Sequence, residues 1–366
     1  MKIRHLLLSA LVLVLITGCI PEDKPDELPD DQPITILESK KGDYPILLPF
    51  SYSPLRQEYA SYFREVDMME IGARLQEKTK EHFDPKDYYI SEGSLIDEDR
   101  YYSLLGYQSD KNPNGLNLKP FEIKDGSVTI TDPKFVSDIM EINFHKTNDL
   151  NQIDGMGIAL VLKRVQILDH KIGSTHRLSD EVLYEVGRTL GLRLYSYLTS
   201  LEGMSDIPIY IGLYVQESDV DQLPGKYLPG HYIGHAFFES RSDQFVKDNE
   251  QWLYIGSNQS NNVIPDFSSA FNRFKKSIYK FTSDENVGVV GKGFLIDNKL
   301  QDVQIEVITG SKTYLEMYGL AQFIAEEMKI FTETQVPITV NIKIHQNSRI
   351  IIAKEPGKDI KFIEVK

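Results

Sequence analysis

Ile207-Pro208-Ile209-Tyr210-Ile211-Gly212-Leu213-Tyr214-Val215 returns in altered form 129 residues later, as Val336-Pro337-Ile338-Thr339-Val340-Asn341-Ile342-Lys343-Ile344. In both stretches apolar residues occupy alternate positions, which is the pattern of a strand with one buried face. In both, a proline stands at the start of the strand, where a missing N–H is tolerated. The two stretches therefore predict one structural unit that occurs twice.

A helical pattern precedes each of these strands. Apolar residues recur at intervals of three and four over residues 183–201 in the first copy and over about 313–332 in the second. Ser179 or Asp180 is a plausible N-cap of the first helix. We expect Gly187 and Gly191, four residues apart on that helix, to permit close packing rather than to bind a ligand.

A second, shorter match lies upstream. Gly93-Ser94-Leu95-Ile96-Asp97 resembles Gly293-Phe294-Leu295-Ile296-Asp297, and a helical pattern precedes each stretch. The offsets of the two matches differ by 71 residues, so we expect an insertion in the first copy over about residues 100–177. Turn-rich residues 110–118 in this region are a loop signal.

The expected helices and strands do not alternate strictly. We therefore predict an α+β fold of two tandem related units, each with helices packed on a mainly antiparallel sheet. Hairpin partners of the two repeated strands are expected at residues 231–238 and 350–354. The first unit is expected to span residues 44–242 and the second residues 243–366.

The N-terminus has the pattern of a lipoprotein signal peptide. Lys2, Arg4 and His5 form a short basic region, residues 6–16 are uncharged, and Cys19, the only cysteine, follows Gly18 directly. The apolar run is too short for a spanning helix, which needs ~20 residues. We expect lipoprotein signal peptidase to remove residues 1–18 by cutting between Gly18 and Cys19. A diacylglycerol on the Cys19 thiol would then anchor the chain to the extracytoplasmic face of the cell membrane.

A proline-rich acidic stretch follows the cysteine. Residues 20–36 read IPEDKPDELPDDQPITI, with a proline at every fourth position and one lysine among six acidic residues. This composition buries too little apolar surface to fold, and its like charges extend it. Residues 19–43 are therefore expected to be an extended, disordered spacer that carries the lipid. The alternative is an acidic docking or cation-binding segment.

The charge balance excludes several partners. Lys and Arg total 40 and Asp and Glu total 54, which gives a net charge of −14. Removal of Lys2 and Arg4 with the signal peptide leaves −16. This balance argues against nucleic acid as a partner and against adsorption to anionic lipid. With a single cysteine, no disulfide is possible within one chain.

Few residues carry a catalytic or metal-binding pattern. His231 and His235 stand four apart, but the glutamate of H-E-x-x-H is absent. We expect two exposed strand histidines and no metal site. The segment from Ser277 to Lys280 fits S-x-x-K but lacks the S-D-N and K-T-G partners of penicillin-interacting enzymes. Residues 288–293 (GVVGKG) lack the spacing of a phosphate loop. No catalytic residue is expected, and no cofactor besides the covalent diacylglycerol.

Tyrosines cluster around the expected insertion. They could line a groove for a peptide or a glycan, because a tyrosine ring buries area while its hydroxyl finds a partner. They could equally lie on the surface of strands. The residues are Tyr88, Tyr89, Tyr101, Tyr102 and Tyr107.

Several of these stretches resemble the CamS family, the sex pheromone lipoprotein precursors of Gram-positive bacteria. Tyr44 to Phe50 resembles the opening strand of that family, and Val66 to Ile96 resembles its first helix and the strand beyond it. Further similarity lies at Gly115-Leu116-Asn117, Pro224-Gly225, Pro229-Gly230 and Val289 to Asp297. Leu118 and Lys119 depart from the family's G-L-N-P motif. The resemblance also implies two related units.

The resemblance implies that activity lies in the part of the chain that is removed. In such precursors, the end of the signal peptide is released as a small hydrophobic signalling peptide after an intramembrane protease trims it. The corresponding segment is Leu11, Val12, Leu13, Val14, Leu15, Ile16, Thr17 and Gly18. The alternative is an inactive remnant, which every lipoprotein signal peptide leaves.

Three function classes follow. The first is a non-enzymatic, membrane-anchored lipoprotein of this precursor family. The second is an extracytoplasmic protein that binds a ligand or assists assembly of the cell envelope, and the sequence does not name its ligand. The third is a cell-wall enzyme, for which no constellation of residues is found.

Overall fold

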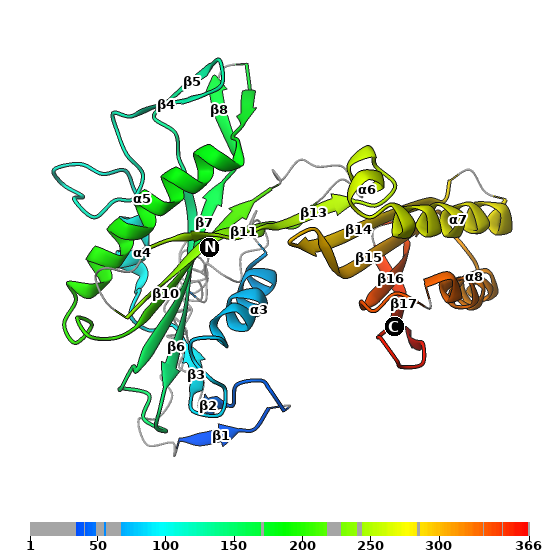
Figure 1. The fold of residues 1–366 in the computed structure, drawn as a ribbon, viewed down its shortest axis with the longest axis horizontal. Coiled ribbons are helices and arrows are strands. Elements are labelled where there is room, and N and C mark those ends of the chain that lie inside the picture. Colours follow the sequence, from blue (N-terminus) through cyan, green and yellow to red (C-terminus); the bar gives the residue numbers. More distant parts are fainter. Residues whose placement is uncertain are drawn as a thin grey trace, which may run out of the picture.

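The computed structural model describes residues 34–39, 41–48, 55, 67–169, 172–217, 228–239, 244–283, 286–331, 333–345 and 347–364. Two large sheets dominate it, one built from strands within residues 35–247 and one from strands within residues 250–364 (Figure 1). Helices pack against both sheets. This confirms the predicted α+β class.

The first sheet has eight strands in the order β1-β2-β3-β6-β7-β10-β11-β12. The strands are β1 (Thr35–Leu37), β2 (Ile46–Leu48), β3 (Tyr89–Glu92), β6 (Val136–His145), β7 (Gly155–Lys163), β10 (Ile209–Gln216), β11 (His231–Phe238) and β12 (Val246–Lys247). Neighbours are antiparallel except β2 with β3 and β7 with β10. Two small hairpins, β4 (Glu122–Asp125) with β5 (Val128–Thr131) and β8 (Val165–Asp169) with β9 (Ser174–Arg177), project from its end (Figure 1).

The second sheet has six strands in sequence order from β13 to β18. They are β13 (Glu250–Tyr254), β14 (Gly288–Ile296), β15 (Lys299–Thr309), β16 (Ile338–Ile344), β17 (Asn347–Lys354) and β18 (Lys361–Glu364). Only β15 and β16 run parallel.

The helices begin at residues that suit an N-terminus. Side chains of Asp67, Asp97 and Ser179 accept backbone N–H groups at the first turns of α3, α4 and α5, and Thr313 with Glu316 forms a capping box on α8. The elements are α3 (Met68–Thr79), α4 (Glu98–Leu105), α5 (Asp180–Thr199), α6 (Asn258–Val263), α7 (Pro265–Thr282), α8 (Tyr314–Glu327) and the 3₁₀ turn η1 (Met328–Phe331).

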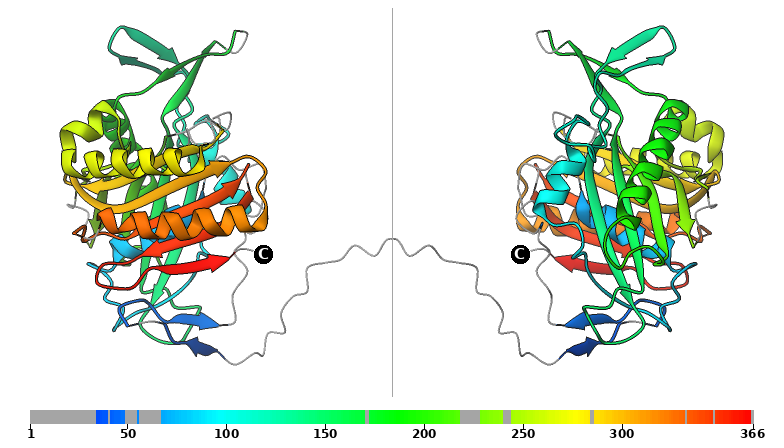
Figure 2. Two further views of the ribbon diagram at one scale, coloured as in Figure 1. Left: turned by 90° about the vertical axis from the view of Figure 1, so that its right-hand side faces the viewer. Right: turned by 90° about the vertical axis from the view of Figure 1, so that its left-hand side faces the viewer.

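Helices cover the two sheets differently. In the first unit, α5 packs on one face and α3 on the other, and each face has its own apolar core. A Cβ on Gly187 would lie 2.6 Å from Leu162, and one on Gly191 would lie 2.4 Å from Phe245. This close approach confirms the packing role predicted for the two glycines. In the second unit, α7 and α8 lie side by side over one face of the sheet (Figure 2).

The two repeated stretches occupy the same place in their sheets. Each unit contains a strand, a helix, a parallel strand and then an antiparallel neighbour: β7-α5-β10-β11 in the first and β15-α8-β16-β17 in the second. The carbonyl of Pro208 accepts from the N–H of Met156, and that of Pro337 accepts from Val303, both at 3.1 Å. The proline thus has the same role at the start of β10 and of β16.

The two stretches of the shorter match do not form equivalent structural elements. Residues 93–97 form the turn after β3, where Asp97 caps α4, whereas residues 293–296 are the end of β14. Residues 100–177 contain β6 and β7, which are inner strands of the first sheet, so they are not one insertion. A five-residue similarity is too short to determine strand pairing. The assignment of residues 44–242 and 243–366 to two units stays a prediction; β12 at Val246–Lys247 still pairs in the first sheet.

A cluster of buried charges joins the two sheets. Arg74 and Lys78 of α3 contact the carboxylate of Glu250, the first residue of β13, and Lys78 also lies 3.1 Å from Asp248. The Glu250 carboxylate accepts the backbone N–H of Tyr232 in β11 at 2.9 Å. We call these contacts the joint.

Candidate functional site

The residues predicted for lipidation and peptide release lie outside the described residues. This holds for Cys19, for Gly18 and for the whole segment from Leu11 to Gly18. Their roles stay predictions. The described part of the chain can still show what the mature domain presents.

The two histidines of β11 are not both exposed, so that expectation was wrong. His231 is buried, with its Nδ1 3.5 Å from Oε1 of Glu217, while Nδ1 of His235 lies 2.9 Å from Asp248. Each ring thus has its own acidic neighbour, and α5 packs on the same strand. Across the described ranges, no group of three or more His, Cys, Asp or Glu residues is placed to hold a metal ion.

The burial of His231 predicts a loss of stability in mild acid. Burial lowers the pKa of His231 below its usual value. The negative charge of Glu217 acts in the opposite direction but does not outweigh the effect of burial. The unfolded chain, with a histidine pKa of about 6.5, therefore takes up a proton first as the pH falls. We expect the free energy of unfolding to fall more steeply between pH 7.5 and pH 5.5 in the wild type than in His231→Gln, as measured by urea unfolding.

The control for this prediction is His345→Asn. His345 is exposed and has a φ of 54°, which asparagine tolerates. This variant should keep the wild-type dependence on pH. Equal slopes for the wild type and His231→Gln would contradict the prediction.

The S-x-x-K segment has a structural role. Ser277 donates to Oε2 of Glu327 at 2.5 Å, which ties α7 to α8, and Lys280 points into solvent. Residues 288–293 form part of β14, and Nζ of Lys292 lies 3.4 Å from Glu306. Neither segment resembles an assembled active site.

The tyrosines do not line one groove. Tyr88 packs edge-on against Phe83 in the core on the α3 side of the first sheet. Tyr101 belongs to the core on the opposite face and donates to Asp138 at 2.9 Å. The sheet separates them, so the hypothesis of a shared tyrosine groove was wrong.

A serine–histidine contact joins β3 to the last residue of β6, two neighbouring inner strands of the first sheet. Oγ of Ser91 is 2.8 Å from Nε2 of His145, and Nδ1 of His145 is 2.7 Å from the carbonyl of Gln152. This orientation resembles that of a nucleophile and its base. However, His145 is wholly buried, and its contacts join β3, β6 and the turn before β7. The contacts of His145 hold the turn before β7 in place. The sequence did not indicate the contact between Ser91 and His145, because these two residues are far apart in the chain.

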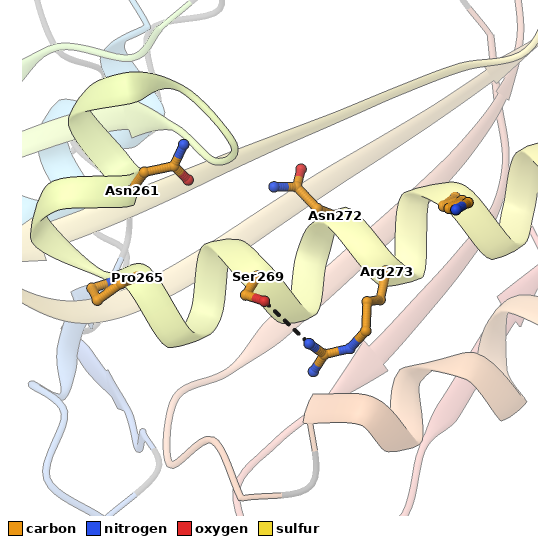
Figure 3. A pocket seen from close by; sticks show the side chains of 6 residues that line it. Asn261, Pro265, Ser269, Asn272 and Arg273 are labelled. Atoms are coloured by element: carbon orange, nitrogen blue, oxygen red, sulfur yellow. Dashed lines mark hydrogen bonds between the residues drawn. The ribbon is translucent and has the colours of Figure 1, made fainter.

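A groove runs along the N-terminal half of α7. One cavity of about 440 Å³ is lined by polar side chains, among them Asn272, Arg273 and Lys276 (Figure 3). A second of about 540 Å³ also borders Arg273 and has the apolar residues Phe267 and Ile330 in its wall. The guanidinium of Arg273 donates to Ser269 at 3.1 Å (Figure 3).

Both hollows are shallow and open to solvent, and Asp266 and Glu333 line the larger one together with Arg273. Sequence reasoning missed this groove. The only signal in the sequence was the run of cations on α7.

No helix in the described portion is long and apolar enough to cross a membrane. No curated protein matches the chain. Several solved structures share its fold. A sex pheromone precursor from Lactobacillus salivarius subsp. salivarius is 19% identical, with a TM-score of 0.73 over 91% of this chain and 99% of that chain.

A second structure is the C-terminal domain of the sex pheromone staph-cAM373 precursor from Staphylococcus aureus. It is 22% identical, with a TM-score of 0.62 over 81% of this chain and 96% of that chain. At these identities the structures establish the fold alone. A family model described as the CamS sex pheromone cAM373 precursor matches residues 54–360. Because this match spans most of the sequence, the chain belongs to the CamS sex pheromone cAM373 precursor family.

Proposed function

We propose that this chain is a surface lipoprotein that is also the precursor of a hydrophobic signalling peptide. Lipoprotein signal peptidase cuts before Cys19, the acylated thiol anchors the mature chain, and residues 11–18 are released. The observation that carries the proposal is the single cysteine directly after Ile16-Thr17-Gly18, in a chain of a pheromone precursor family.

The chemistry of the segment suits this role. Residues 11–18 (LVLVLITG) contain no charged side chain, so the octamer partitions readily into a bilayer. Cleavage before Cys19 leaves Gly18 with a free carboxylate, and trimming at Leu11 by an intramembrane protease frees the amino end. The mature domain is proposed to have no enzymatic role, since its family is not a known enzyme class.

Mass spectrometry of the culture medium tests this proposal. Medium from wild-type cells should contain the octamer or its trimmed forms, and medium from Cys19→Ala cells should lack them, because the signal peptidase requires the cysteine. An immunoblot of the membrane fraction serves as the control for anchoring. If wild-type medium lacks the peptide while the protein is found in the membrane fraction as usual, the proposed release of the peptide is wrong. The proposed lipid anchor would not be affected by this result.

A further inference from the structure

The outer side of the α7–α8 layer exposes large apolar side chains. Tyr314 and Leu315 are 68% and 75% exposed, and Tyr279, Phe281 and Tyr318 are also exposed. The rings of Tyr314 and Tyr318 stack at 6.0 Å. The left view of Figure 2 shows the two helices next to each other in front of the second sheet. We call this surface the outer helical face.

Helix α8 exposes apolar residues at its N-terminal end. Its inner side buries Met317, Leu320 and Ile324 against the sheet. Tyr314, Leu315 and Tyr318 are exposed in its first two turns, whereas the exposed positions further along are the polar residues Gln322 and Glu326. Exposed apolar surface of this kind marks a contact with a protein or a membrane.

Positive charges border the same face. The second half of α7 carries Arg273, Lys275, Lys276 and Lys280 and no acidic residue. Within the described residues, no ion pair includes any of these four side chains. Lys275 instead lies 5.7 Å from the ring centre of Tyr279. In a chain with a net charge of −14, this is a local concentration of cations that form no ion pair with the described residues.

We propose that the outer helical face docks on an anionic lipid surface. Tyrosines and a leucine suit the boundary between headgroups and acyl chains, where an amphipathic ring has both a polar and an apolar neighbour. Lysines beside them attract anionic headgroups. A symmetric contact with a second copy fits less well, because it would bring the cations of α7 together.

The proposed lipid anchor would hold this face within reach of the membrane, and this step alone rests on the proposed function. Residues 20–33 separate Cys19 from the first described residue. At ~3 Å per residue an extended chain of this length spans ~40 Å. The net charge predicts repulsion from anionic lipid, but charges more than ~8 Å apart are screened at physiological salt. When the outer helical face touches the membrane, the electrostatic interaction with anionic headgroups is therefore determined by the cations of α7.

Vesicle sedimentation tests the docking with a chain that begins at residue 20 and has no acyl group. Every described contact lies between residues 34 and 364, so this chain keeps all of them. We expect it to sediment with vesicles of phosphatidylcholine and phosphatidylglycerol at 3:1 but not with phosphatidylcholine alone. Bound protein should decrease as salt is added.

Two variants examine the two parts of the face. The triple variant Lys275→Glu, Lys276→Glu, Lys280→Glu should lower the apparent affinity for anionic vesicles at least tenfold. The double variant Leu315→Ser, Tyr318→Ser should also bind more weakly. The matched controls are the triple variant Lys86→Glu, Lys111→Glu, Lys358→Glu, with the same change in net charge at exposed sites, and the exposed Tyr102→Ser. Both controls should bind as the wild type does.

Three results would overturn the proposal. The chain could fail to bind anionic vesicles, or the triple α7 variant could bind like its control. The face could instead mediate self-association, seen as a concentration-dependent dimer that Leu315→Ser, Tyr318→Ser abolishes. None of these results bears on the lipid anchor, because the tested chain lacks Cys19. The anchor is tested separately by the comparison with Cys19→Ala.

Discussion

Replacement of Glu250 by alanine is expected to lower the free energy of unfolding by about 3–5 kcal/mol, the usual cost of removing one partner from a buried ion pair. The Glu250 side chain is 3% exposed. It contacts Arg74, lies 2.8 Å from Nζ of Lys78 and accepts the backbone N–H of Tyr232. The variant therefore leaves two cations and one backbone donor without this carboxylate.

The surroundings of Arg74 cannot take over the role of Glu250. The guanidinium lies 4.0 Å from the ring centre of Phe294 and 5.7 Å from that of Tyr232, so aromatic faces enclose it on the other sides. Glu70 lies 3.6 Å away on the same helix, farther from the guanidinium than the carboxylate of Glu250, and burial raises the pKa of its carboxyl. Because α3 packs on the first sheet and Glu250 begins the second, the variant also loosens the joint.

Urea unfolding followed by tryptophan fluorescence measures the effect. Trp252 is the only tryptophan, and it lies on β13 two residues after Glu250, with its ring 5.2 Å from that of Phe294. The control is Glu77→Ala on α3, which also removes a lysine partner but whose carboxylate is 73% exposed. An exposed pair contributes about 0–1 kcal/mol. Similar losses in the two variants would show that burial of the joint does not determine its contribution.

The sequence predicted the elements whose pattern is local. Strands β10 and β16 follow from alternate apolar residues and a leading proline, and α5 and α8 follow from spacings of three and four. These patterns depend on residues within one element. The correspondence between β10 and β16 was visible because it extends over nine residues of alternating pattern.

The sequence did not predict what depends on pairing between distant elements. The place of β14 in the second sheet corresponds to β6 in the first, but the short match suggested residues 93–97 instead. Arg74 and Glu250 are 176 residues apart, and nothing local to either residue indicates the contact. The burial of His231 comes from Glu217 and α5, so the histidine spacing alone led to the wrong expectation.

The candidate sites also divide into those with a local sequence pattern and those that depend on contacts between distant elements. The lipidation motif is a contiguous pattern that can be recognised from the sequence, and it stays a prediction because it lies outside the described residues. The groove along α7 needs Leu300, Ile330 and Val336 from other elements to form its wall. The outer helical face needs α7 and α8 to lie together, which only the folded sheet enforces.

Replacement of Phe274 by alanine should cost about 3–5 kcal/mol of unfolding free energy, as for other buried phenylalanines. Phe274 is fully buried in the core beneath α7 and α8, with its ring 5.3 Å from Phe331 and 6.5 Å from Phe271. The vacated volume is bounded by two helices and the sheet, which cannot close it without moving. The loss should appear in urea unfolding of the second unit, which Trp252 reports.

Phe281→Ala is the matched control, because the same residue type lies on the same helix and differs in burial. Phe281 is exposed and stacks on Phe323 at 4.1 Å, so its removal should cost less than about 1.5 kcal/mol, the upper value for an aromatic pair. If the outer helical face docks on lipid, Phe281→Ala should weaken vesicle binding while the folded state stays intact. Phe274→Ala, assayed where it is still folded, should bind as the wild type does. Opposite effects on stability and binding from these two phenylalanines would separate the buried core beneath α7, which holds the fold, from the exposed C-terminal end of the helix, which meets the membrane.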